Sequence, residues 1–126
     1  MKAQILVISA LFSVGVANAG ERLKGDELKA FWTDKTIVGE HQKIGAIKTY
    51  HAVDGKVTSI SGSGKERTGK WWIDESANTK CIEWDNKSQG GCHYTERNKD
   101  GSLTLIHGSK GTKLVEIKSS KQGNQL

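Results

Sequence analysis

The sequence predicts an all-β protein, specifically a small antiparallel up-and-down barrel of about eight strands with a short N-terminal helix. Short β-prone runs follow one another from Thr36 onward, and the chain contains 15 glycines and no proline, which suits short strands and tight turns. Short connections force neighbouring strands to be antiparallel. About eight strands can close around a packed interior or one small ligand, and closure removes exposed sheet edges. A two-sheet sandwich is the second alternative.

The N-terminal residues 1–19 have the layout of a cleavable signal peptide. Lys2 supplies the charged start, residues 5–16 the apolar run, and Ala17-Asn18-Ala19 a cleavage site of small residues. We therefore expect one mature domain over residues 20–126, located in a bacterial periplasm or, alternatively, secreted. The apolar run is too short to span a bilayer and no second one follows, so we expect no membrane span.

The charge pattern argues against a nucleic-acid partner. The chain has 19 basic and 14 acidic side chains, a formal net charge of +5, and the two signs are interspersed. One local basic excess, formed by Lys110, Lys113, Lys118 and Lys121, lies near the end of the chain. Such a balance is typical of a solvated surface.

A short amphipathic helix is predicted ahead of the strands, over residues 26–32. Leu28, Phe31 and Trp32 have the spacing of one helical face, and the acidic pair that opens the segment suits the N-terminal end of a helix. We expect the apolar face to cover one end of the β-structure rather than to bind a partner.

The strands are predicted from β-prone runs bounded by turn residues. Asp54-Gly55 and Asp100-Gly101 each lie between two such runs, and an Asp-Gly pair in that position is a strong hairpin signal. The polar tail after residue 118 is expected to be frayed. The predicted strands span residues 36–41, 44–53, 56–61, 68–74, 80–84, 91–97, 102–107 and 112–118.

The two cysteines, Cys81 and Cys92, are predicted to form a disulfide. In an exported chain with two cysteines, pairing with each other is the simplest outcome. The cross-link would staple a hairpin, and loop-closure entropy suggests roughly 3 kcal/mol of stabilisation.

Aromatic residues are the best sequence evidence for a binding role. Trp71, Trp72, Trp84, Tyr50 and Tyr94 could line a cavity or form a sugar-stacking surface. In a small domain short of Phe and Met, core packing is the main interpretation of these rings, and a binding role for at least one of them is the alternative. Because Trp71 and Trp72 are adjacent on a predicted strand, one ring must face outward or lie under the N-terminal helix.

No catalytic or metal-binding pattern is evident. The four histidines show none of the spacings typical of zinc sites and are interpreted as scattered surface or hydrogen-bonded residues. Nucleophile-elbow, redox and phosphate-loop motifs are also missing. We therefore expect no catalytic residues, no metal, no cofactor and no enzymatic activity.

One run of motifs resembles a known family. DGKV at 54–57, GKWWID at 69–74 and CIEW at 81–84, followed by Cys92, occur in the order seen in a family of small exported bacterial proteins of unknown function. The resemblance covers roughly residues 23–105. It implies a lipocalin-like or calycin-like barrel in the periplasm, without catalytic residues to transfer.

A second likeness is to the periplasmic inhibitors of C-type lysozyme. The sequence SGSGK at 61–65 is similar to the inhibitory loop of that family, so Ser61, Ser63 and Lys65 become candidate partner-contact residues. The aromatic residue expected soon after the loop is missing, because Glu66-Arg67-Thr68 follow instead.

The leading functional prediction is a non-enzymatic periplasmic barrel that binds a small apolar molecule, a glycan or another envelope protein. The alternative is inhibition of lysozyme through the 61–65 loop, where a basic side chain would enter an acidic cleft.

Overall fold

The computed structural model of the protein describes residues 20–88 and 90–126, and the predicted signal peptide lies outside them. No helix within this part of the chain has the length and apolar character needed to cross a bilayer. The elements, in chain order, are α1 (Gly25–Trp32), β1 (Lys35–His41), β2 (Gly45–His51), β3 (Lys56–Ser61), β4 (Glu66–Asp74), β5 (Thr79–Trp84), β6 (Gly91–Arg97), β7 (Leu103–His107) and β8 (Lys113–Gln122).

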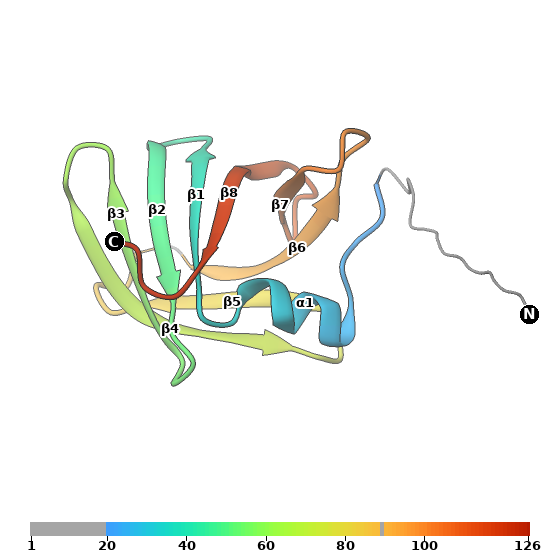
Figure 1. Ribbon diagram of the computed structural model, residues 1–126, viewed down its shortest axis with the longest axis horizontal. Helices are drawn as coiled ribbons and strands as arrows, with labels where there is room; N and C mark the ends of the chain where they lie inside the picture. The colour runs from blue at the N-terminus through green and yellow to red at the C-terminus, as the bar shows by residue number, and fades with distance from the viewer. Residues whose placement is uncertain (1–19, 89) are drawn as a thin grey trace, which may run out of the picture.

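The eight strands form a closed barrel in which each strand pairs with its neighbours in the sequence (Figure 1). Every pair is antiparallel, and β1 closes the barrel against β8, with Lys35 opposite Gln122 and His41 opposite Val115. The predicted up-and-down barrel is therefore confirmed, and the sandwich alternative is wrong.

Side chains alternate between the barrel interior and its outer surface. On β4, Trp71 points inward and is 7% exposed, whereas Trp72 is 46% exposed on the outer face. This confirms that one ring of the pair faces outward. On β5, the alternate residues Lys80, Ile82 and Trp84 are all buried.

Both Asp-Gly pairs lie at hairpin turns, as predicted. Gly55 and Gly101 have φ angles of 95° and 87°, in the left-handed region that glycine adopts most easily. The carboxylates of Asp54 and Asp100 each accept a hydrogen bond from the backbone N–H two residues on, at 3.0 and 2.9 Å. These bonds hold the turns that set the strand register.

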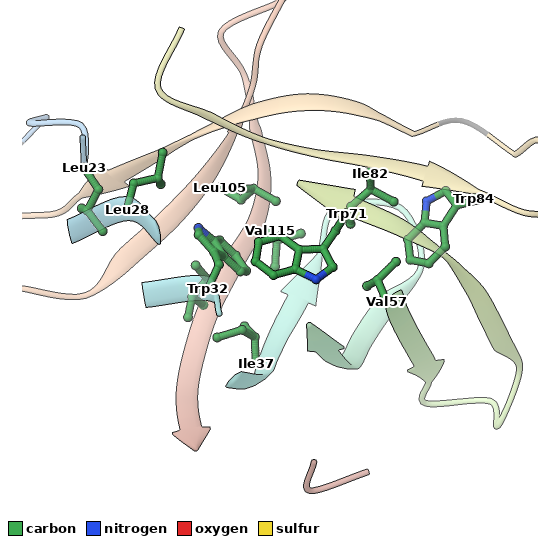
Figure 2. Packing of buried hydrophobic residues seen from close by; sticks show 11 residues of the cluster. Leu23, Leu28, Trp32, Ile37, Val57, Trp71, Ile82, Trp84, Leu105 and Val115 are labelled. Carbon is green, nitrogen blue, oxygen red and sulfur yellow. The ribbon is translucent and has the colours of Figure 1, made fainter. Parts of the chain in front are cut away.

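Helix α1 covers one end of the barrel, which we call the closed end (Figure 1). Its buried residues, Leu28 and Trp32, pack in the core cluster with Leu23, which precedes the helix (Figure 2). The Trp32 indole N–H donates a buried hydrogen bond to Thr95 Oγ1 on β6, at 3.0 Å. The helix is therefore the core lid that its apolar spacing predicted.

The disulfide between Cys81 and Cys92 is confirmed. The two residues are directly opposite on β5 and β6, with Cα atoms 4.0 Å apart. The β5–β6 ladder has only three paired positions. The cross-link thus holds together one of the shortest ladders of the barrel.

The C-terminal segment differs from the frayed tail expected after residue 118. Strand β8 continues to Gln122, and its last residues pair with the start of β1. Beyond the strand, the Gly123 N–H donates to the Asp34 carbonyl at 2.8 Å, and Thr36 Oγ1 donates to the Gly123 carbonyl at 2.6 Å. Because main-chain groups make most of these contacts, the polar side chains of the tail gave no sign of the pairing.

Candidate functional site

The barrel encloses a cavity of about 430 Å³ that opens at the end opposite helix α1. This volume is within the range of pockets that hold small organic ligands. The opening is framed by the β1–β2 and β7–β8 turns, which lie side by side because β1 pairs with β8 (Figure 1). The walls are largely apolar and include Ile37, Ile47, Ile82, Leu105 and Val115.

A buried lysine lies at the closed end of this cavity. Lys80 is only 2% exposed, and its Nζ is 3.2 Å from His51 Nε2. The same Nζ lies 4.2 Å from the centroid of the Trp32 ring, within the distance of a cation–π contact. Since Trp32 ends the helix that covers the barrel, the Lys80 ammonium group lies deep, far from the opening.

Strand alternation directs Lys80 inward, in phase with Ile82 and Trp84. Among the described residues, no aspartate or glutamate lines the cavity, and Lys80 forms no ion pair. A buried ammonium group without an ion pair loses its hydration and gains no opposite charge in return. Burial accordingly lowers the pKa of Lys80 to about 7, so both its charged and neutral forms are populated at neutral pH.

All four histidines of the chain line the cavity: His41, His51, His93 and His107. Burial, reinforced by the charge of Lys80, holds the pKa of His51 well below its usual value. Burial and then Lys80 lower the pKa of His93 to about 4. Both buried rings are therefore neutral at neutral pH, and the Nδ1 atoms of both have no hydrogen-bond partner among the described residues.

The histidines were expected to be scattered surface or hydrogen-bonded residues. Three of them, His41, His51 and His107, do form hydrogen bonds, but all four line one cavity, which corrects the expectation that they are scattered. His93 and His107 are close, with ring centroids 5.5 Å apart. Within residues 20–88 and 90–126, however, no group of three or more histidine, cysteine, aspartate or glutamate side chains is arranged to hold a metal ion.

Further basic groups lie between the middle of the cavity and its opening. The Arg67 guanidinium group stacks over the Trp84 ring at 4.1 Å, and both residues line the cavity. Exposed lysines at the opening are Lys43, Lys110 and Lys113. With basic groups along its length and no acidic residue among its described lining, the cavity has a positive potential.

Of the five aromatic residues predicted to bind a ligand, the structure places Trp84 at the cavity. Trp71 is buried nearby, but its indole N–H donates to the Ala52 carbonyl at 2.8 Å and its ring packs in the core. The others, Trp72, Tyr50 and Tyr94, lie on the outer face, where Tyr50 donates to Asp34 and Tyr94 stacks under Arg22.

The 61–65 loop forms the turn between β3 and β4, and it is mostly exposed. Ser61 Oγ and Ser63 Oγ are 2.8 Å apart, and the Ser61 N–H donates to the Lys65 carbonyl at 2.9 Å. The Lys65 side chain is exposed. The turn is thus held by its own hydrogen bonds and exposes one basic side chain. The inhibitor role stays a prediction.

Sequence reasoning missed the polar residues at the closed end. Lys80 points to the same side of β5 as Ile82, two positions further on, and it is paired with Ile73 on β4. Its place among apolar residues was the signal that Lys80 is buried. His51 and His93 come from β2 and β6, and only barrel closure brings them to the same interior.

The fold and cavity together define an eight-stranded antiparallel β-barrel with a largely apolar, basic interior. Comparison of the chain with protein-family models, curated proteins and solved structures finds no match. Both family resemblances in the sequence remain predictions.

Proposed function

We propose that this protein is a non-enzymatic binding barrel that holds a small, largely apolar ligand in its interior. The observation that carries the proposal is the cavity of about 430 Å³, whose lining surface is mostly apolar. Ligand pockets of this kind combine apolar walls with a few polar groups that fix orientation. Lys80 and the buried histidines are such groups here.

Apolar walls favour a small hydrophobic or amphipathic molecule over a glycan, which needs many hydrogen-bond partners. An envelope protein would instead bind outside the barrel, where Trp72 is 46% exposed. The cavity makes internal binding the stronger proposal. Export to the periplasm, as the 1–19 segment predicts, is part of the proposal.

Binding can be tested with Nile red, a neutral dye whose emission rises and shifts to the blue in apolar surroundings. We expect saturable enhancement by the wild-type protein. The Ile47→Trp variant should lose it, because Ile47 lines the cavity and is only partly buried, so the larger ring would fill the space.

Lys48→Trp is the matched control, since Lys48 is exposed on the outer face of the same strand. This variant adds the same ring outside the barrel and should keep the enhancement. Equal enhancement in the Ile47→Trp and Lys48→Trp variants, or none with the wild type, would contradict internal binding.

Lysozyme inhibition through the 61–65 loop is decided by a separate assay. Lysis of peptidoglycan by C-type lysozyme is measured with and without micromolar protein. If the barrel binds only through its interior, lysis is unchanged. Slower lysis that is restored by Lys65→Ala would establish the alternative, because the exposed Lys65 is the basic group that this loop presents.

A further inference from the structure

We propose that the ligand is an amphipathic organic acid whose anionic head group pairs with the Lys80 ammonium group at the closed end of the cavity. This inference rests on the proposed ligand-binding function and adds the chemical class of the ligand and its direction in the barrel. Three independent features of the cavity support it: its charge, its unfilled hydrogen-bonding capacity and the order of its polar and apolar parts.

The charge around Lys80 is uncompensated on every side. His51 faces it from β2, His93 is opposite it on β6, and Trp32 covers it from α1. The other titratable groups of the described lining are also bases: Arg67, His41, His107 and the lysines of the opening. An anion is therefore the ligand that this interior stabilises most, whereas a cation would add to the repulsion.

The hydrogen-bonding capacity at the closed end is only partly used. An ammonium group has three N–H donors. Among the described residues, His51 Nε2 is the acceptor that Lys80 Nζ contacts, and the Trp32 ring covers a second direction. His93, 6% exposed and on the same cavity wall, has an Nδ1 without a partner. A carboxylate or phosphate oxygen would form a strong charge-assisted bond with the remaining ammonium N–H.

The burial of Lys80 sets the direction of the ligand, because the other cationic side chains of the lining, Arg67 and the lysines of the opening, are more exposed to solvent. Lys80 and Trp32 lie at the closed end, while apolar residues such as Ile47 and Leu105 line the walls. An acid that entered head first would place its charge on Lys80 and its chain along those walls. The lysines of the opening would attract the anion from solution, since basic rims increase the association rate of acidic ligands.

A bound anion must also change the protonation of Lys80. Burial lowers its pKa to about 7, and a neighbouring negative charge favours the ammonium form and raises the pKa again. Binding therefore takes up a proton above about pH 7, and the affinity for the acid falls as the pH rises further. His51 and His93 are already neutral in this range, because their pKa values lie below it.

Isothermal titration calorimetry with ligands of equal chain length tests the head-group preference. Decanoate and decyl phosphate are the acids, decanol is the neutral analogue, and decyltrimethylammonium is the cation. At about pH 6, one acid or both should bind about tenfold or more tightly than decanol, as expected for a charge-assisted hydrogen bond. Their relative affinities distinguish a carboxylate from a phosphate head group.

Two further measurements assign the preference to Lys80. At about pH 8, repeating the titration in buffers of different ionisation enthalpy should show uptake of close to one proton per bound acid. Lys80→Met should abolish both this uptake and the preference for acids, while decanol binding persists. Lys70→Met is the matched control, because Lys70 is exposed on the outer face of β4, and it should behave as the wild type.

The inference and the proposed function fail in different ways. Decanol binding as tightly as both acids, tightest binding of the cation, or an acid preference that survives Lys80→Met would overturn the inference and leave internal binding intact. Absence of binding by all four ligands and by Nile red would overturn both. The proton-uptake measurement uses the wild-type protein, so absence of uptake would overturn the inference even if the variant does not fold.

Discussion

Lys80 and His51 face each other inside the barrel, with Nζ and Nε2 3.2 Å apart. While Lys80 is protonated, its nitrogen can only donate, so His51 Nε2 is the acceptor and the proton of the neutral imidazole lies on Nδ1. Protonation of His51 would put two cations in contact in a buried site. The charged forms of the two residues therefore exclude each other, and the lysine is charged at neutral pH only while the histidine is neutral.

The first prediction concerns Lys80 and the pH dependence of stability. Burial lowers the pKa of Lys80 from 10.5 to about 7. Between these two values the unfolded chain binds more protons than the folded chain, so the Lys80 contribution to the free energy of unfolding rises with pH. Lys80→Met should remove this rise. Near pH 6, where the wild-type Lys80 is charged, the substitution should stabilise the protein by roughly 1–3 kcal/mol because it removes an unpaired buried charge. Urea denaturation across the pH range measures both effects.

Lys70→Met controls for the loss of a positive charge elsewhere, since Lys70 is exposed on the neighbouring strand. Its free energy of unfolding should stay within about 0.5 kcal/mol of the wild type. A parallel pH dependence in Lys80→Met and the wild type would show that the buried amine does not titrate as described.

The second prediction concerns His93 and mild acid. Burial and the nearby charge of Lys80 lower its pKa from 6.5 to about 4. In this window the unfolded chain again binds more protons, so stability falls as the pH falls from 6.5 towards 4. His93→Gln should remove part of the loss, roughly 1–3 kcal/mol, in acid denaturation followed by tryptophan fluorescence. An acid transition unchanged by this substitution would assign the loss to other groups.

The antiparallel order of the strands was predictable because local signals fix it, whereas closure was favoured over a sandwich because it removes exposed sheet edges. The Asp-Gly turns at 54–55 and 100–101 set two hairpins, and short connections left antiparallel neighbours as the only choice. The cysteine pair followed from its count in a chain predicted to be exported. The end of β8 was missed because its pairing with β1 uses backbone groups between residues far apart in the sequence.

The candidate site was less predictable, since it depends on closure rather than on local pattern. Trp71, Trp72 and Trp84 stand out by residue type, but strand phase puts Trp72 on the outer face and the other two inside. Of the two inner rings, Trp84 lines the cavity and Trp71 does not. Burial of Lys80 was not predicted, because a lysine on a strand is ordinarily exposed. Its inward phase with Ile82 was visible in the sequence, whereas its meeting with His51 required the complete barrel.

The third prediction concerns the disulfide. Cys81→Ala/Cys92→Ala should lower the free energy of unfolding by roughly 3 kcal/mol, because the cross-link restricts the unfolded chain. The β5–β6 ladder, with three paired positions, supplies few hydrogen bonds to compensate. Denaturation of the oxidised wild type, the reduced wild type and the double variant measures the effect. The reduced wild type and the double variant should have the same free energy of unfolding. A double variant as stable as the oxidised protein would show that the disulfide is dispensable.

The fourth prediction concerns the close approach of β4 and β5 at Gly69. A Cβ atom at this position would lie 2.3 Å from the Glu83 carbonyl oxygen and 2.9 Å from Trp84 Cα, and both are backbone atoms that cannot move without disturbing the ladder. Gly69→Ala should therefore lower the free energy of unfolding by roughly 1–3 kcal/mol. It should also weaken Nile red binding, because Trp84 would be displaced from the cavity wall.

Gly62→Ala is the matched control: its Cβ would meet Ala46 at an ordinary 3.7 Å, so both stability and dye binding should be unchanged. Equal effects of the two substitutions would show that glycine at 69 is not required for the approach of the strands.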